Sequence, residues 1–345
     1  MTFCAVTEFL PPRFLDTFSK INYFCLSSIF LLTMNKHFLF LGLVCLFSLS
    51  LLSCATGRNS MGKKIKNAPK HVVLIGFDGL SAHAVKSDEA RMPVFKKLME
   101  RGAGTLENRS VLPSSSAVNR ASMFMGAGPE LHGYTEWGSA RPDLPPRVLT
   151  DNGMFPDIYY LLRKARPEAE LGFFYEWGGM RRLVDTLSVS RLEPLALSAG
   201  NTEQAVAGVT AYIREKKPLF CSVIFGEPDG VGHGIGWESP EYFAMLAHLD
   251  RALGRIVQAV DDAGMTDETV FILAADHGGI RKGHGGKTME EMQTAIVFSG
   301  KGVKAGYRIP ESTMVFDIAG TVAWLFGLEA PQVWLARPIK SAFED

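Results

Sequence analysis

The sequence predicts an α/β fold, a doubly wound and mostly parallel sheet flanked by helices. Three short runs rich in Val, Ile and Phe are bounded by Gly or Pro, at residues 71–77, 219–228 and 269–275. Such runs are typical of strands that are buried on both faces of a parallel sheet. Helical patterns alternate with them over short connections, which favours strands joined by crossover helices in three layers.

The remaining elements follow the same alternation in chain order. A helix is predicted from Pro93, a residue suited to the first turn, to Gly102. Further along, apolar periodicity and turn residues predict the helices 117–125, 156–163, 201–216, 240–264 and 316–326 and the strands 171–175 and 295–299. Asn201 and Gln204 are spaced like a capping box.

The amino-terminal segment is expected to lie outside the fold. Residues 34–54 have the pattern of a signal peptide, with a cationic start and an apolar stretch too short for a membrane span. Its ending resembles a bacterial lipobox, in which Cys54 would be lipidated; an ordinary secretory peptide or an uncleaved anchor is the alternative. Residues 1–33 are interpreted as a mis-assigned gene start, 55–69 as a linker, and 70–340 as the catalytic domain.

Charge and cysteine content exclude two classes of protein. Acidic and basic side chains balance, and no long basic run is present. Binding of a nucleic-acid polymer is therefore not expected. Four of the five cysteines precede residue 55, which leaves only Cys221 in the folded part. Since Cys221 lies within a predicted buried strand, we expect a small apolar side chain rather than a disulfide or a nucleophile.

Acidic side chains end the three apolar runs. Asp78, Asp229 and Asp276 follow them directly, and three histidines lie close behind the last two: His233, His277 and His284. Ligands bind outside the carboxyl ends of the strands in open α/β sheets, so these groups should converge on one crevice. Mixed carboxylate and imidazole ligands suit zinc, with manganese or iron as alternatives, and fit calcium or magnesium poorly.

A serine is predicted at the start of a helix between the first and second of these acids. Ser116 precedes the helical residues 117–125, which Gly126 ends. Backbone N–H groups and the helix dipole favour negative charge there, which suits an alkoxide and a phosphate oxygen. The alternative is that Ser116 only caps the helix.

Taken in order, these stretches resemble the alkaline phosphatase superfamily, and its type I phosphodiesterase/nucleotide pyrophosphatase branch above all. The matching stretches are Asp78-Gly79, Pro113 to Asn119, Gly128-Pro129-Glu130-Leu131-His132-Gly133, Pro228-Asp229-Gly230-Val231-Gly232-His233, Asp276-His277-Gly278 and Gly283-His284-Gly285-Gly286. The resemblance covers residues 70–340 and implies an alkaline-phosphatase-like three-layer sandwich.

The resemblance also implies two metal sites and a nucleophile. Asp229, His233 and His284 would hold one ion; Asp78, Asp276, His277 and the Ser116 hydroxyl would hold the other. Ser116 would attack phosphorus and form a phosphoseryl intermediate. Asn119 and Arg120, one helical turn further on, would contact phosphate oxygens.

The chain departs from this branch at two positions. Ser116 stands where phosphodiesterases usually have threonine, and Trp137 stands where they usually have an asparagine that binds phosphate. We expect Trp137 to form an apolar wall for the leaving group together with Tyr175 and Trp177. His132 is interpreted as structural.

Together these features predict an exported hydrolase with two divalent ions, zinc or manganese, acting on a small-molecule phosphate ester. It would be periplasmic or at the cell surface, anchored in the membrane through Cys54. The alternatives are a phosphomonoesterase, a phosphonate hydrolase or a sulfatase on the same scaffold, a transferase, and a surface lipoprotein without catalysis. The segment Ser116 to Arg120 has Val118 where the modified residue of a sulfatase requires Pro or Ala, which disfavours that class.

Overall fold

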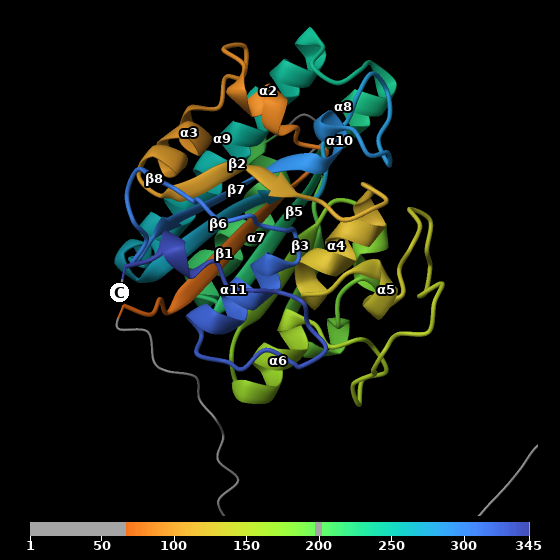
Figure 1. The fold of residues 1–345 in the computed structure, drawn as a ribbon. Coiled ribbons are helices and arrows are strands. Elements are labelled where there is room, and N and C mark those ends of the chain that lie inside the picture. Colours follow the sequence, from red (N-terminus) through yellow and green to blue (C-terminus); the bar gives the residue numbers. More distant parts are fainter. Residues whose placement is uncertain (1–66, 197–201, 345) are drawn as a thin grey trace, which may run out of the picture. The chain divides into compact units, whose positions relative to one another are not determined.

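The computed structural model describes residues 67–196 and 202–344, which form an α/β domain around an eight-stranded sheet (Figure 1). The strand order is β4-β3-β5-β1-β6-β7-β2-β8. The strands are β1 His71–Asp78, β2 Ala103–Arg109, β3 Leu171–Tyr175, β4 Arg191–Pro194, β5 Phe220–Pro228, β6 Thr269–Ala275, β7 Gln293–Gly300 and β8 Tyr307–Arg308.

Helices cover both faces of the sheet, and short helices lie within the connections between strands. The α-helices are α2 Ala82–Lys86, α3 Pro93–Glu100, α4 Ser116–Met125, α5 Pro129–His132, α6 Ile158–Ala165, α7 Thr202–Lys216, α8 Asp229–Gly234, α9 Pro240–Asp262, α10 Met289–Met292 and α11 Asp317–Leu325. Short 3₁₀ turns are η1 Gly178–Arg182, η2 Thr186–Ser188, η4 Thr266–Glu268 and η5 Lys340–Ala342. Within the described ranges, none of the helices has the length and apolar character needed to cross a bilayer.

The sheet is parallel except at one strand. β7 runs antiparallel to both β6 and β2, whereas the other pairs are parallel. After β6 the chain therefore turns at the carboxyl edge of the sheet and re-enters the sheet as the neighbouring antiparallel strand β7. This arrangement puts residues 276–292 directly above the ends of the central strands, and it confirms the predicted mostly parallel sheet.

Two apolar cores lie on opposite faces of the sheet. Along β1, Val72 and Leu74 pack with α4, α6 and α11, whereas Val73 and Ile75 pack with α3, α7 and α9. This alternation is the period of two expected for a strand that is buried on both faces. The described chain is thus the three-layer sandwich that the sequence predicts.

The central elements agree with the predictions, and the strands at or next to the edges of the sheet, β2, β4 and β8, were missed. Strands β1, β3, β5, β6 and β7 and helices α3, α4, α6, α9 and α11 lie within a few residues of their predicted bounds. The sequence of β2, AGTLENR, has few β-branched or aromatic residues, so no pattern indicated a strand. The predictions for residues 1–66, including Cys54, and for Asn201 as a capping residue lie outside the described residues.

Candidate active site

The predicted ligands come together at the carboxyl edge of the sheet. Asp78 is the last residue of β1, Asp229 follows β5, and Asp276 follows β6. These three strands are neighbours, with β1 hydrogen-bonded to both β5 and β6. Ser116 reaches the same edge as the first residue of α4, after β2. The fold therefore collects groups that are up to about two hundred positions apart in the chain.

One group consists of Asp229, His233 and His284. Asp229 Oδ2 lies 3.4 Å from His233 Nε2, and Asp229 Oδ1 lies 3.5 Å from His284 Nε2. The two Nε2 atoms are 3.0 Å apart. Asp229 and His233 are at opposite ends of one turn of α8, and this turn aims both side chains at the same point.

The second group consists of Asp78, Asp276 and His277. His277 Nε2 lies 3.3 Å from Asp78 Oδ1 and 3.7 Å from Asp276 Oδ2. Ser116 Oγ joins this group, at 3.1 Å from Asp78 Oδ1 and 3.0 Å from His277 Nε2. The two groups adjoin, because the rings of His277 and His284 stack with centroids 3.8 Å apart.

Ser116 is not the capping residue of its helix. The N-cap position belongs to Ser115, whose side chain makes no capping hydrogen bond. Ser116 is the first helical residue and its hydroxyl points to the carboxylates instead. The alternative interpretation of Ser116 as a cap is therefore wrong.

Main-chain carbonyl groups fix the tautomers of all three histidines. The Nδ1 atoms lie 2.8 Å from Gly278 O in His277, 2.9 Å from Ser114 O in His284 and 3.0 Å from Lys282 O in His233. A carbonyl oxygen can only accept, so each Nδ1 carries the hydrogen and each Nε2 of a neutral ring presents a lone pair to the site. This is the arrangement in which histidines bind metals.

Burial and neighbouring charges shift the pKa values of these side chains in opposite directions. Burial lowers the pKa of His277, but the charges of Asp276 and Asp78 outweigh it and raise this pKa to about 9. Burial and the charge of Asp78 raise the pKa of Asp229, and burial raises the pKa of Asp276 despite the nearby Arg120. Burial also raises the pKa of Asp78, but the hydrogen bond of His277 and the charge of Arg120 outweigh it and lower this pKa overall. Burial and the charge of His277 lower the pKa of His284 to about 4.

The donor set fits divalent metal ions. Two lone-pair-bearing Nε2 atoms only 3.0 Å apart, in His233 and His284, repel each other unless a proton or a cation lies between them. The buried Asp229 Oδ1 has no hydrogen-bond partner among the described residues. Imidazole and carboxylate ligands in this ratio match zinc or a neighbouring transition metal.

The predicted phosphate contacts of Asn119 and Arg120 do not fit the structure. Asn119 is fully buried, and its amide accepts from Val111 N and donates to the carbonyl oxygens of Val111, Pro113 and Ser115. No donor of this side chain remains for a phosphate. The corrected role of Asn119 is to hold the loop before Ser116 in place.

Arg120 compensates charge inside the protein. It is fully buried, with Nε 3.0 Å from Asp276 Oδ2 and Nη2 3.9 Å from Asp78 Oδ2. Its guanidinium lies across Gly76 of β1, where an added Cβ would come within 2.6 Å of Nη1. Arg120 therefore lies behind the two carboxylates, on the side away from solvent, and offsets their negative charge, although its Nε and Nη2 make no hydrogen bonds to the described residues.

Sequence reasoning missed the residues that support the ligands. Ser114 Oγ donates to Gly286 O at 2.7 Å and accepts from Gly285 N at 3.1 Å, so it ties the loop of His284 to the loop of Ser116. Glu291 holds the same loop through Gly286 N at 2.8 Å. Only the position of Ser114 inside the serine run hinted at a role.

A second pair of supports fixes the turn after Asp78. Gly79, at φ 67°, donates its N–H to Asp276 Oδ1, and its carbonyl accepts from Trp237 Nε1 at 2.9 Å and Tyr242 Oη at 2.8 Å. Trp237 also packs edge-on against His233 with ring centroids 5.3 Å apart. These aromatic residues had no motif to mark them.

The other predicted side chains have structural contacts. His132 is buried, with Nδ1 accepting from Tyr134 N and Nε2 3.0 Å from Ser122 Oγ. Cys221 is a free and fully buried thiol in β5. Both observations fit the roles expected from the sequence.

The expected aromatic group forms in part. Trp137 stacks on Trp177, with ring centroids 6.2 Å apart and an interplanar angle of 17°. Tyr175 instead stacks on Phe173 inside the core.

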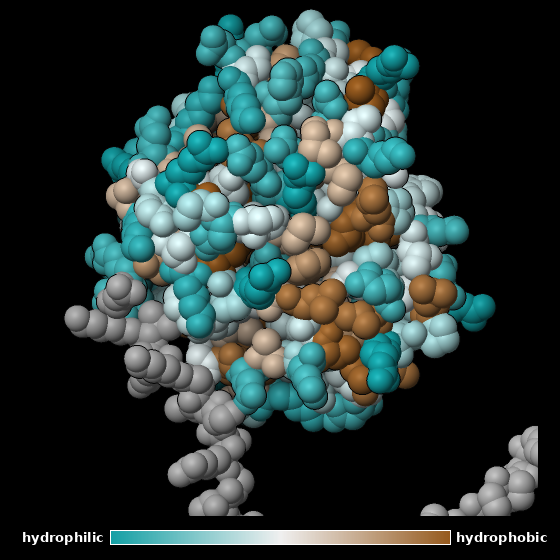
Figure 2. All heavy atoms as spheres, viewed as in Figure 1, coloured by the Kyte–Doolittle hydropathy of each residue, from teal (hydrophilic) through white to brown (hydrophobic). Residues whose placement is uncertain are grey.

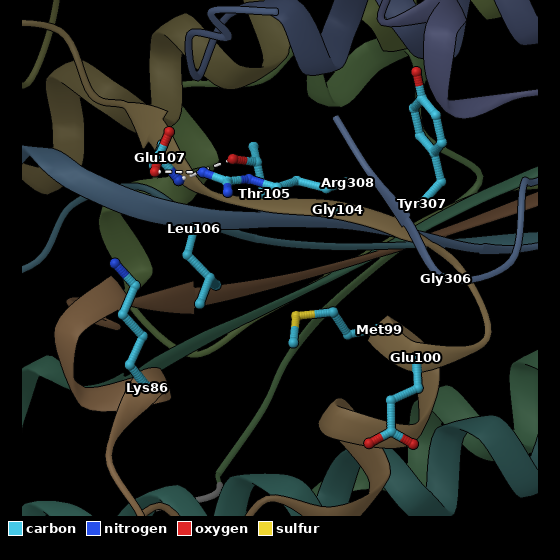
Figure 3. A pocket seen from close by; sticks show the side chains of 10 residues that line it. All are labelled: Lys86, Met99, Glu100, Gly104, Thr105, Leu106, Glu107, Gly306, Tyr307 and Arg308. Carbon is cyan, nitrogen blue, oxygen red and sulfur yellow. Dashed lines mark hydrogen bonds and ion pairs between the residues drawn. The ribbon is translucent and has the colours of Figure 1, made fainter. Parts of the chain in front are cut away.

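A surface cavity of about 540 Å³ lies elsewhere in the domain (Figure 3). It is formed by α3, β2 and β8, and an ion pair between Arg308 and Glu107 bounds it. Its lining contains no His, Cys, Ser or Asp, the residue types that form the cluster at the carboxyl edge. We therefore assign the chemistry to the carboxyl edge of the sheet.

Comparison with known proteins identifies the family. The chain belongs to the type I phosphodiesterase/nucleotide pyrophosphatase family, whose pattern residues 72–159 and 165–313 match. Apart from residues 197–201, both matched ranges lie within the described residues, and together they contain every predicted ligand.

Two curated relatives are similar to this chain in sequence over part of their length. The mouse ectonucleotide pyrophosphatase/phosphodiesterase family member 1 is 24% identical over 218 residues, which are 60% of this chain and 24% of that protein. Human family member 7 is 31% identical over 131 residues, 37% of this chain and 28% of that protein. The matched part thus spans about a quarter of the length of these curated relatives.

Solved structures agree on the fold. Murine ectonucleotide pyrophosphatase/phosphodiesterase 5, an inactive variant in complex with AMP, superposes with a TM-score of 0.62 at 14% identity, over 80% of this chain and 100% of that chain. A 2-O GAG sulfatase superposes with a TM-score of 0.63 at 14% identity, over 79% of this chain and 73% of that chain. At such identities the likeness extends to the fold alone.

Proposed function

We propose that this protein is a metal-dependent phosphodiesterase in which Ser116 is the nucleophile. The observation that carries the proposal is the position of Ser116 Oγ, 3.1 Å from Asp78 Oδ1 and 3.0 Å from His277 Nε2, at the start of α4. A hydroxyl among metal-type ligands and at a helix N-terminus is suited to react as an alkoxide.

Two divalent ions fit the two ligand groups, and zinc matches their chemistry best, with manganese as the alternative. Asp229, His233 and His284 would hold one ion; Asp78, Asp276, His277 and Ser116 would hold the other. When bound, such ions lower the pKa of a coordinated hydroxyl or water and neutralise charge on the phosphoryl oxygens.

The residues of the chain would then act in two steps. Ser116 Oγ attacks phosphorus in line, the Oγ–P bond forms, and the bond from phosphorus to the leaving alcohol breaks. Water next attacks the phosphoseryl group, releases the phosphate monoester and restores the hydroxyl. His277 and Asp78 keep Ser116 Oγ in place, and Arg120 offsets the charge of both carboxylates from behind.

The test compares two adjacent serines. Purified protein with zinc or manganese is assayed with bis-para-nitrophenyl phosphate and with para-nitrophenyl phosphate. Ser116→Ala should abolish turnover, whereas Ser115→Ala should keep it, because Ser115 Oγ has no partner among the described residues. Diester turnover that persists in Ser116→Ala would refute the nucleophile.

The preferred ester decides between the proposal and its nearest alternative. Faster turnover of the diester supports a phosphodiesterase. Faster turnover of the monoester, with the same dependence on Ser116 and metal, would make the protein a phosphomonoesterase on this scaffold.

We also propose that the protein is exported and anchored through a lipid on Cys54. The sequence of residues 34–54 supports this, and the names of relatives, ectonucleotide enzymes and venom phosphodiesterases, agree with export. Metabolic labelling with palmitate should mark the wild type and leave Cys54→Ala unlabelled. Label retained in this variant would contradict the anchor.

A further inference from the structure

One buried indole lies between the segments that carry the histidines of the candidate site. Trp237 is in the loop from α8 to α9, and it is 8% exposed. On the face shown in Figure 2, the apolar residues that reach the surface gather near α4 and α5. Trp237 is a different case, because its contacts are almost all internal and these contacts define its role.

Two glycines form the slot that Trp237 fills. An added Cβ at Gly232 would come within 2.7 Å of the ring atoms Cε3 and Cζ3, and one at Gly279 within 2.1 Å of Cε2. Gly232 directly precedes His233 in α8. Gly279 lies two positions after His277, in the connection from β6 to β7. The indole therefore sets the distance between these two segments, because a closer approach would overlap its ring.

The same ring contacts two histidines of one ligand group. Its centroid lies 5.3 Å from that of His233, with an interplanar angle of 84°, and 6.0 Å from that of His284, with an angle of 66°. Both imidazoles thus meet the indole edge to face, a favourable arrangement for aromatic rings. Their Nε2 atoms are 3.0 Å apart. Lone pairs that face each other at this distance repel, and a ring packed against both imidazoles opposes their separation.

A hydrogen bond fixes the indole in its slot. Trp237 Nε1 donates at 2.9 Å to Gly79 O, directly after Asp78. Gly79 O also accepts from Tyr242 Oη at 2.8 Å, so the turn after Asp78 keeps a donor if the indole N–H is removed. This turn therefore depends less on Trp237 than the two histidine rings do.

We propose that Trp237 is a positioning residue for metal binding, which holds His233 and His284 at the separation that one divalent ion requires. The inference rests on the proposed function, because it concerns one of the two ions proposed there. Trp237 acts through the two imidazoles and contacts neither the substrate nor the reacting atoms. Its removal should weaken the binding of this ion and leave the ion at the other ligand group, which contains Asp78, in place.

The experiment measures the zinc affinity of the metal-free protein by competition with a chelator. Trp237→Phe removes the indole N–H and shortens the ring that fills the slot. Since a group that orients metal ligands contributes about 10–100-fold to metal affinity, we expect one of the two zinc dissociation constants to rise by about tenfold or more. The other should stay within about twofold of the wild type, because the turn after Asp78 keeps its second donor.

The matched control is another buried indole, on the opposite face of the sheet. Trp334 is 7% exposed, and its Nε1 donates to Pro156 O at 2.9 Å. Its ring lies against Gly126, where an added Cβ would come within 2.5 Å of Cδ2. Trp334→Phe should therefore lose stability in urea as Trp237→Phe does, but both zinc affinities should stay as in the wild type. Equal losses of zinc affinity in the two variants, or no loss in Trp237→Phe, would overturn the inference.

A second background assigns the effect to one ligand group. His233→Ala removes a ligand of the site that Trp237 is proposed to support. Adding Trp237→Phe to this variant should therefore leave the affinity of the remaining zinc site unchanged. A further loss of zinc affinity in this background would overturn the inference, because the indole would then act on the fold as a whole.

Failure of the inference can be distinguished from failure of the proposed function. A wild type that binds two zinc ions and hydrolyses the diester, with unchanged zinc affinity in Trp237→Phe, overturns the positioning role alone. A wild type that binds no zinc overturns both.

Discussion

Replacing Ser114 by alanine tests whether the site is supported in the way that the structure indicates. Ser114 is fully buried, and its hydroxyl makes two hydrogen bonds to the loop of His284, at 2.7 Å to Gly286 O and 3.1 Å to Gly285 N. Ser114→Ala removes both bonds but keeps Ser114 O, which accepts from His284 Nδ1. The tautomer of His284 is thus retained while its loop loses an attachment.

The expected losses follow from these contacts. Two hydrogen bonds of this kind stabilise a folded protein by about 1–3 kcal/mol in total. Removing a group that orients a metal ligand weakens metal binding by about 10–100-fold. Since the main-chain contact to His284 remains, we expect the loss of metal affinity in Ser114→Ala to be near the lower end of this range, at about tenfold.

The assay measures zinc affinity by competition with a chelator, and the free energy of unfolding by urea. Ser110→Ala is the matched control, because Ser110 is equally buried and its hydroxyl donates to Met292 O at 3.0 Å, outside the His284 loop. Both variants should lose stability, but only Ser114→Ala should lose zinc affinity. Zinc affinity within twofold of the wild type in Ser114→Ala would refute the reasoning.

Three further predictions concern other parts of the domain. Burial lowers the pKa of His132 to about 3, below its unfolded value of about 6.5, so the stability of the wild type relative to His132→Asn should fall by about 1.4 kcal/mol per pH unit below pH 6.5; equal slopes in urea unfolding would contradict this. Gly76→Ala places a Cβ 2.6 Å from Arg120 Nη1 and should cost about 1–3 kcal/mol, whereas Gly254→Ala, with its nearest atom at 3.4 Å, should be neutral or stabilising. Zinc at a hundred times its dissociation constant should stabilise the chelator-treated protein by about 2.7 kcal/mol in thermal unfolding, and Asp229→Asn should reduce this gain; an unchanged melting temperature on adding zinc would argue against a metal site.

The sequence was sufficient to predict which acids and histidines lie together, because their positions follow from the fold. Asp78, Asp229 and Asp276 each end a continuous apolar run, and parallel strands deliver their carboxyl ends to one edge. Two of the histidines, His233 and His277, follow these acids within one turn. The group that assembles at the edge is therefore determined by local patterns and one rule of topology.

Contacts between side chains that lie far apart in the sequence could not be predicted in this way. The start of α3 was predicted from Pro93, but its free N–H groups bind Asp250 of α9, whose carboxylate accepts from Val94 N and Phe95 N. Nothing near residue 93 indicates that partner. The same limit applied to Arg120, since a buried arginine behind two carboxylates and an arginine facing a phosphate have the same local sequence.

The serine run 114–116 shows why residue type alone is insufficient at such a site. Three identical and adjacent side chains have three different environments: Ser114 Oγ binds the loop of His284, Ser115 Oγ is buried without a partner among the described residues, and Ser116 Oγ lies between Asp78 and His277. The turn into α4 causes the difference, because each step along it points the next hydroxyl in a new direction. A change of one position separates a support, an inert hydroxyl and the proposed nucleophile. Exchanging Ser116 and Ala117 should therefore abolish turnover even though the composition of the segment is unchanged.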